Sequence, residues 1–336
     1  MKKVLITGAA GFVGSELAKF LTKQGGYELV LVDNLSFGHI ENLASDNQEN
    51  LFANFKVADI RSDNIESLLS GVDTVFHFAG VAPLPVCQTQ PKLAYDINVS
   101  GTLNLLEACR RKGVSKFIFS STSAVYENTK SECLREDDDI SPDLVYAMTK
   151  ASAEKACQAY SQSYGMNILI FRFFNVYGPH QDFKRKSPPF TSYVTRELSF
   201  DRTPVLYNSS TTAKRDYVHS YDLVRLMQLA CDTEKTYASE IFNVASGNGY
   251  SVPELYSNLL DISGKSIKAE YKNPELYWEA YDSLYQGKYQ LSKDRIKKEV
   301  YKQAVGSPEK TFKEFNWKTF IDIKTGLQSV YNFIND

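Results

Sequence analysis

The sequence lacks the features that mark membrane-spanning, metal-stabilised and disulfide-bonded proteins. No apolar run approaches the roughly 20 residues that a helix needs to cross a bilayer, and residues 1–6 lead directly into a strand-like run instead of a signal peptide. The five cysteines are scattered, with no CxxC pair and no histidine at ligand spacing. We therefore expect a cytoplasmic protein that holds no metal and has no disulfide frame.

The sequence also has no excess of charge of either sign. Its 38 Lys and Arg residues and 40 Asp and Glu residues are interspersed and give a formal net charge of -2. That balance offers no basic field for a nucleic-acid backbone or an anionic membrane, so we expect neither partner and a small-molecule ligand instead. With 43% hydrophobic residues over 336 positions, the chain can bury one large core or two unequal ones.

Short apolar runs alternate with segments of helical spacing through about the first half of the chain. The runs are rich in Val, Ile and Phe and cover residues 3–7, 28–33, 55–58, 74–79, 116–121 and 167–173. Because they are apolar at consecutive positions, both of their faces are expected to be buried. Alternating strands and helices of this kind predict an α/β protein with a Rossmann-type, doubly wound parallel sheet.

The regular alternation ends near Asn175, where turn-rich stretches and shorter helical segments take over. This change predicts two regions that pack against each other around a cleft. We expect a dinucleotide-binding Rossmann domain over residues 1–175, to which some later segments return. Residues 176–336 are expected to form a smaller C-terminal α/β lobe that binds the substrate.

The first strand is followed by a glycine-rich turn and then a helix. Residues 7–14 read Thr-Gly-Ala-Ala-Gly-Phe-Val-Gly. Gly8 permits the tight turn, Gly11 lets the backbone approach a pyrophosphate, and Gly14 lets the helix pack closely on the strand. The next strand ends in Asp33, which can accept hydrogen bonds from ribose hydroxyls and repels a 2'-phosphate. Together these residues favour NAD over NADP.

Tyr146 and Lys150 form a second constellation. Their spacing of four puts both side chains on one face of a helix. There the ammonium is expected to lower the pKa of the phenol, which suits a base that removes an alcohol proton. Two other Tyr-x-x-x-Lys pairs in the chain share this spacing. Position favours Tyr146, because it opens a long helical segment soon after the hydroxyl-rich strand end at residues 120–123.

These motifs, in this order, resemble the extended short-chain dehydrogenase/reductases. More narrowly, they resemble the NAD-dependent epimerase/dehydratase branch, which acts on sugar nucleotides. The resemblance is carried by residues 7–14, 33–35, 59–61, 77–80, 98–102, 120–126, 146–150, 172–179 and 215–219. It extends from the first strand to about Val252, and the remaining stretch resembles the family only loosely.

The resemblance implies a role for each matching residue. Tyr146 would be the base and Lys150 its partner, while Thr122, with Ser123 nearby, would bond the reacting sugar oxygen and help to pass the proton. The residues implied to hold NAD are Gly8, Gly11, Phe12, Val13, Gly14, Asp33, Asn34, Asp59, Ile60, Phe78, Ala79, Gly80, Asn98, Ser120, Tyr146 and Lys150.

The resemblance also implies the partners. A nucleotide-diphospho-sugar would be bound by Asn175, at the sugar or its phosphates, and by Arg215, at the diphosphate. An arginine in a turn-rich lobe is a sensible anion clamp, although Arg215 could instead pair with Asp216. The family would further imply a homodimer built on the helices over residues 98–111 and 146–164.

The two residues directly after Thr122 indicate the reaction. Family members that eliminate water resemble one another in carrying an Asp-Glu pair there, whereas this chain has Ser123-Ala124. This favours a UDP-sugar 4-epimerase that works through a 4-keto intermediate. Glu127 stands where the family usually has glycine, so it is either a loop residue or an unusual acid or base. A dehydratase, a 4-dehydrogenase or a decarboxylase remains an alternative, as does a silent NAD sensor.

The C-terminal part departs from the family. Between Ala269 and Phe315 an aromatic-rich stretch over residues 277–289 is followed by the charged, helix-like run 292–302. The family normally has a compact polar segment here that closes over the nucleotide. The aromatic side chains either stack on the base or form the core of the lobe.

Overall fold

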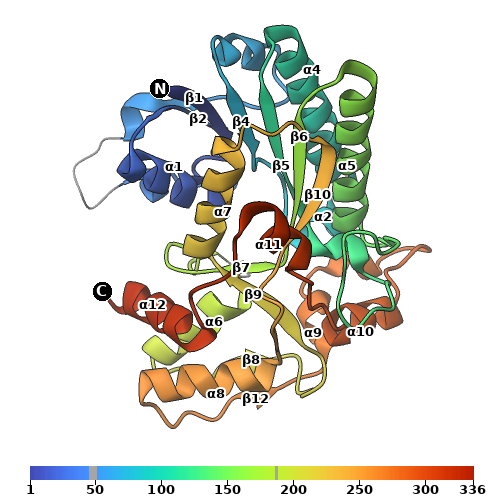
Figure 1. Cartoon of the computed structure of the whole chain (residues 1–336). Coiled ribbons are helices and arrows are strands. Elements are labelled where there is room, and N and C mark those ends of the chain that lie inside the picture. The colour runs from blue at the N-terminus through green and yellow to red at the C-terminus, as the bar shows by residue number, and fades with distance from the viewer. Residues whose placement is uncertain (45–50, 186–187) are drawn as a thin grey trace.

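The computed structural model describes residues 1–44, 51–185 and 188–336. Within them, seven parallel strands form one sheet in the order β10-β6-β5-β4-β1-β2-β3 (Figure 1). The strands are β1 (Lys2–Thr7), β2 (Tyr27–Asp33), β3 (Phe55–Val57), β4 (Thr74–His77), β5 (Lys116–Thr122), β6 (Ile168–Phe173) and β10 (Ala238–Val244). The order reverses between β1 and β4, which makes their carboxyl ends the crevice where such sheets bind ligands. The predicted fold class is confirmed.

Helices cover both faces of this sheet, and the alternation along β1 shows which residues face which layer. Val4 and Ile6 share a buried cluster with α1 (Phe12–Gln24), α7 (Ser220–Asp232) and α11 (Glu309–Phe315). Leu5 belongs instead to the cluster formed with α4 (Thr102–Lys112), α5 (Val145–Tyr164) and the 3-10 helix η3 (Asp63–Leu69). Successive side chains of a strand point to opposite faces, so a strand buried on both sides is apolar throughout.

Short elements complete the first half of the chain. They are η1 (Ile40–Leu43), η2 (Leu51–Asn54), α2 (Leu84–Thr89), α3 (Pro91–Tyr95), the π-helical turn η4 (Asp96–Gly101) and η5 (Ser123–Tyr126). Across the described ranges, no helix is both long and apolar enough to cross a membrane.

The second half builds a smaller lobe below the large sheet (Figure 1). Its strands are β7 (Asn175–Tyr177), β9 (Arg215–His219) and β11 (Gly249–Tyr250) in one sheet, and β8 (Val205–Leu206) with β12 (Glu270–Tyr271) in another. Around a common apolar core lie α6 (Phe190–Ser199), α8 (Val252–Ser263) and α12 (Ile323–Asn335). Because β10 and α7 return to the large sheet, the regions 1–175 and 176–336 share that sheet.

The aromatic-rich tail forms α9 (Pro274–Glu279), η6 (Asp282–Tyr285) and α10 (Lys293–Tyr301). Trp278, Leu284 and Ile296 are buried in a cluster of their own, with Leu144 from just before α5. Tyr277, Tyr281 and Tyr285 pack against this cluster, so these aromatic residues take part in a hydrophobic core, whereas Tyr289 is 89% exposed.

A buried ion pair fastens α5 to the sheet. Arg172 on β6 donates to both carboxylate oxygens of Glu154 on α5, at 2.8 and 3.0 Å, and their side chains are only 3% and 2% exposed. Ser121 on β5 also donates to Glu154, and Arg172 donates to the Tyr126 hydroxyl at 2.7 Å. A buried pair of this kind is costly to break, because the remaining partner keeps an uncompensated charge.

We expect Glu154→Gln to lower the free energy of unfolding by about 3–5 kcal/mol, since it leaves Arg172 buried and unpaired. Urea denaturation followed by circular dichroism measures the loss. Glu107→Gln is the matched control, because Glu107 lies in an exposed pair with Arg110 and Arg111. The control is expected to keep the wild-type midpoint. Equal midpoints for both variants would show that the buried pair does not hold α5 in place.

Candidate active site

The glycine turn after β1 is packed too closely for any side chain. Gly8 has φ 69°, and a Cβ atom there would lie 2.7 Å from the backbone nitrogen of Ala79 at the end of β4. A Cβ on Gly14 would overlap the carbonyl of Gly8. Glycine at both positions therefore lets α1 start directly against β1 and β4.

The residues of this turn fit the pyrophosphate of a dinucleotide. Gly11 is the N-cap of α1, and Phe12 and Val13 are its first two residues. The helix has no side-chain cap and no acidic residue in its first turn. Its first N–H groups and the positive end of its dipole are thus available to an anion.

Asp33 lies beside this turn at the end of β2. Its carboxylate accepts hydrogen bonds from the backbone N–H groups of Ala10 at 3.0 Å and Leu35 at 2.8 Å. Burial raises the pKa of Asp33 above its usual range, and these backbone hydrogen bonds oppose the rise. The side chain is thereby oriented at the carboxyl edge of the sheet, where the ribose of a dinucleotide would lie.

The next residues implied for the cofactor continue along the same edge. Asn34 donates to the Asp59 carboxylate at 2.8 Å, and Arg61 donates to both oxygens of that carboxylate. Arg61 holds the pKa of Asp59 well below its usual range. Ile60 is buried against Gly101, where a Cβ would lie 2.6 Å from the Ile60 side chain.

Phe78, Ala79 and Gly80 follow β4 and connect the glycine turn to α5. Ala79 donates its backbone N–H to Thr7 at 3.2 Å. Asn98 is 2% exposed, accepts from the Val81 N–H at 2.8 Å, and donates to Thr149 on α5 at 3.0 Å. The buried asparagine therefore fixes the loop after β4 relative to the helix that carries Tyr146.

The hydroxyl cluster at the end of β5 is held by the backbone around it. Ser120 donates to the carbonyl of His77 at 2.9 Å. Thr122 caps η5 by accepting from the Ala124 N–H at 3.1 Å, and Ser123 is the first residue of η5. The Thr122 hydroxyl is also near enough to Tyr146 to stabilise the phenolate by hydrogen bonding. Thr122 and the phenol thus meet where β5 ends.

Burial shifts the pKa of both members of the pair on α5. Burial raises the pKa of Tyr146 to about 12, and the hydrogen bond with Thr122 opposes the rise. Burial lowers the pKa of Lys150 to about 8, and its Nζ lies 4.3 Å from the centre of the Phe119 ring. Burial thus sets the direction of the Tyr146 shift, and the lowering expected from the Lys150 ammonium stays a prediction.

The two residues assigned to the substrate lie on β7 and β9. Asn175 donates to the carbonyl of Asp216 at 2.9 Å. Arg215 donates to the carbonyls of Glu299, at 2.5 Å, and Lys302, which lie at the C-terminal end of α10. Asp216 instead accepts from Ser246 at 2.7 Å. The alternative that Arg215 pairs with Asp216 is thus wrong, and its guanidinium binds the end of α10.

Two side chains near Tyr146 were missed by the sequence. Gln88 on α2 accepts from the N–H of Val145 at 3.2 Å, and Arg295 on α10 forms an ion pair with Glu127 at 2.8 Å. The unusual Glu127 was a signal for the second contact, whereas nothing in the sequence marks Gln88. In the part of the chain that the structure describes, no three His, Cys, Asp or Glu side chains gather in a way that could hold a metal ion.

These features define an α/β dinucleotide-binding protein with a Thr/Tyr/Lys site at the carboxyl edge of its sheet. A protein-family model described as the NAD-dependent epimerase/dehydratase family matches residues 4–245. A UDP-glucose 4-epimerase of Corynebacterium glutamicum is 31% identical over 279 residues, which cover 80% of this chain and 82% of that relative. The chain belongs to the NAD-dependent epimerase/dehydratase family.

Solved structures agree with this assignment over nearly the whole chain. A UDP-N-acetylglucosamine 4-epimerase from Methanobrevibacter ruminantium M1, in complex with UDP-N-acetylmuramic acid, has a TM-score of 0.84 at 25% identity and covers 99% of this chain and 97% of its own. A UDP-glucuronic acid 4-epimerase from Bacillus cereus, in complex with UDP-glucuronic acid and NAD, has a TM-score of 0.83 at 26% identity, with 99% and 98% covered. The predicted family, and NAD as its cofactor, are confirmed.

The buried ammonium of Lys150 should cost stability. Below pH 8 the folded protein carries this charge at 6% exposure, with a pKa lowered from 10.5 to about 8. We expect Lys150→Met to raise the free energy of unfolding at pH 7 by about 1–3 kcal/mol. The wild type recovers the difference as pH rises from about 8 towards 10.5, because only the unfolded chain still binds the proton there.

Chemical denaturation of the NAD-free protein at several pH values measures this difference. Lys155→Met is the matched control, since Lys155 is exposed on the same helix, and it should leave stability unchanged. A destabilised Lys150→Met variant at pH 7 would show that the ammonium has a favourable partner in the folded protein.

Proposed function

We propose that this protein interconverts the C4 epimers of a UDP-sugar through a 4-keto intermediate, with NAD as its cofactor. The observation that carries the proposal is the placement of Thr122, at the carboxyl end of β5, beside Tyr146, with Lys150 buried one turn further along α5. Relatives named 4-epimerases, with UDP-sugars in two of their complexes, support the same reaction.

Each side chain of this set has a distinct task. Tyr146 is placed to take the proton of the C4 hydroxyl and to return it, and Thr122 bonds the same oxygen. Lys150, a buried cation on the same helix face, favours the phenolate once the site is closed to water. NAD, held at the glycine turn and Asp33, supplies the hydride acceptor and donor. Return of the hydride to the other face of the sugar leaves no net NADH.

The residues beside Thr122 favour epimerisation over elimination of water. Ser123 and Ala124 provide no carboxylate. The Glu127 carboxylate accepts from the N–H groups of Asp143 and Leu144 and forms an ion pair with Arg295. A carboxylate engaged in this way serves poorly as the acid or base of a dehydratase.

We also propose a homodimer through α4 and α5. These helices expose Leu103 and Met148, at 39% and 40%, where a second copy would cover apolar surface. Light scattering on the eluting peak of a sizing column measures the mass, and a monomer at micromolar concentration would refute the dimer.

The function is tested by incubating the purified protein with UDP-glucose, UDP-N-acetylglucosamine and UDP-glucuronic acid. Proton NMR, mass spectrometry and absorbance of NADH follow the products. We expect a product of unchanged mass with inverted C4 and no accumulated NADH. Tyr146→Phe should lower kcat by about 100-fold or more, because the proton acceptor is lost. Tyr164→Phe, at the exposed far end of α5, is the matched control.

The three sugars also decide the substrate, since the one with the highest kcat/KM identifies it. Loss of water or of carbon dioxide from the product would point to a lyase. NADH that accumulates in step with product would identify a dehydrogenase. Either result would reject the epimerase.

A further inference from the structure

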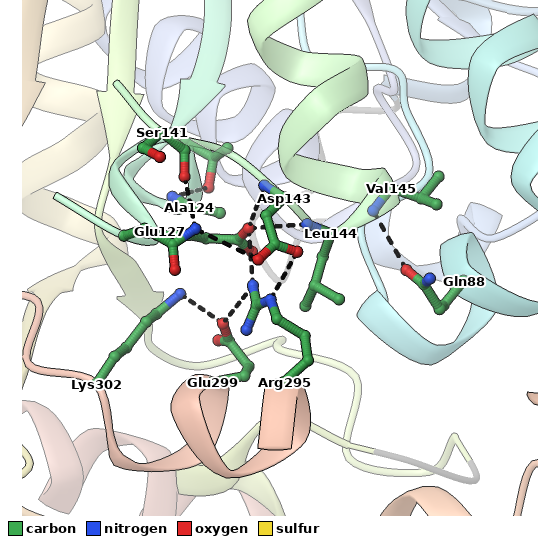
Figure 2. A network of polar contacts seen from close by, with 12 residues as sticks. Gln88, Ala124, Glu127, Ser141, Asp143, Leu144, Val145, Arg295, Glu299 and Lys302 are labelled. Atoms are coloured by element: carbon green, nitrogen blue, oxygen red, sulfur yellow. Dashed lines mark hydrogen bonds and ion pairs between the residues drawn. The ribbon is translucent and has the colours of Figure 1, made fainter. Parts of the chain in front are cut away.

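The first turn of α5, which carries Tyr146, has no cap of its own. Its N-cap is Leu144, and the turn contains no acidic residue. The carboxylate of Glu127, which is distant in sequence, acts as the cap instead. Its Oε2 accepts hydrogen bonds from the N–H groups of Asp143 at 2.8 Å and Leu144 at 2.9 Å (Figure 2). A carboxylate at a helix N-terminus both satisfies orphan N–H groups and lies at the positive end of the dipole.

Glu127 depends in turn on α10. Arg295 places Nη2 2.8 Å from Glu127 Oε2 and Nε 2.8 Å from the Asp143 carboxylate, so one guanidinium bridges both acids (Figure 2). The side chains of Arg295 and Glu127 are 9% and 1% exposed. Glu127 Oε1 is buried and accepts no hydrogen bond from the described residues. Without Arg295, the carboxylate would be a buried charge with too few partners.

The rest of the α10 charges extend this contact. Glu299 lies one turn from Arg295, at 3.7 Å, and pairs with Lys302 at 2.8 Å. Burial raises the pKa of Glu127, and the Leu144 N–H, Lys302 and Arg295 oppose the rise. Lys302 and Arg295 thus favour the ionised carboxylate that accepts hydrogen bonds from the helix start, while burial and Glu299 act in the opposite direction.

An apolar contact acts at the same point. Leu144 is 3% exposed and belongs to the cluster of Trp278, Leu284 and Ile296 from α9, η6 and α10. The residue two positions before Tyr146 is thus held on one side by Glu127 and on the other by the aromatic tail. The sequence departs from the family at both places, at Glu127 and in the aromatic tail.

We propose that Glu127 and Arg295 are positioning residues that fix the first turn of α5, so that Tyr146 is aligned with Thr122, and that docking of α10 completes the active site. The inference rests on the proposed role of Tyr146 as the base. Neither residue touches the reacting atoms. Their effect should therefore fall on kcat, because a small displacement of the base slows the chemical step more than it weakens binding.

The first test replaces Arg295. We expect Arg295→Met to lower kcat by about 10-fold or more while KM changes less than about threefold. Arg295→Lys should restore part of kcat, since the ammonium keeps the charge but lacks the planar fork with which the guanidinium meets both carboxylates. Lys298→Met is the matched control, because it removes the same charge from an exposed position one turn along α10. Unchanged kcat in folded Arg295→Met would overturn the proposal.

The second test asks whether the two residues act as one unit. Glu127→Gln keeps an oxygen acceptor but loses the charge that Arg295 compensates, so this milder variant also serves if Arg295→Met does not fold. We expect the double variant to lose no more kcat than the worse single variant. Losses that multiply would show independent effects and contradict a shared positioning role.

Hydrogen exchange separates this inference from the proposed function. In Arg295→Met, but not in Lys298→Met, the amides of residues 143–146 should exchange at least about 10-fold faster than in wild type. If the wild type turns over none of the UDP-sugars, the proposed function is rejected. Hydrogen exchange at residues 143–146 then tests by itself whether Arg295 fixes the start of α5. If Tyr146→Phe abolishes turnover while the Arg295 and Glu127 variants change neither exchange nor kcat, the positioning role fails and the function stands.

Discussion

The start of helix α5 is the constraint on which the site depends. A helix start leaves backbone N–H groups without partners, and here Tyr146 lies in that first turn with no capping side chain nearby in sequence. Glu127, at the end of η5, and Gln88, on α2, accept hydrogen bonds from N–H groups at this helix start. One turn further along, Asn98 holds Thr149. The position of the proposed base is thus set by three separated parts of the chain.

The same helix carries two buried charges, Glu154 and Lys150. Glu154 is compensated by Arg172 in a buried, two-pronged pair. Lys150, one turn earlier, lies over the face of Phe119, and burial lowers the pKa of its ammonium. The Glu154 carboxylate, which has a structural role, is ion-paired. The Lys150 ammonium, which is proposed to act in catalysis, forms no ion pair with the described residues. This division is the usual one between stability and activity, since a charge kept ready for a ligand cannot also be neutralised by the protein.

The sequence predicted what depends on neighbours along the chain. Apolar runs predicted the strands, and the glycine turn and Asp33 predicted the edge of the sheet at which a dinucleotide would bind. The predicted fold class is confirmed. The sequence did not predict contacts between segments that lie far apart in the chain. The raised pKa of Tyr146 follows from burial, and the carbonyls that bind Arg215 come from a helix that begins 78 residues later, at Lys293. The spacing between Tyr146 and Lys150 does not show how deeply the phenol is buried. Nor does the local sequence show which distant carbonyl Arg215 will bind.

The ion pair between Arg295 and Glu127 also depends on the order in which the ribosome makes the chain. A nascent chain makes β1 to β6 and α5 first, and these elements can pair as they emerge. The Glu127 carboxylate at the start of α5 therefore lacks its ion-pair partner until Arg295 is synthesised, well after β10, the last strand of the large sheet. On the proposed positioning role, the base is aligned late in translation, after most of the NAD-binding edge has been synthesised. A ribosome-bound chain that ends before α10 would have the cofactor edge without a seated base.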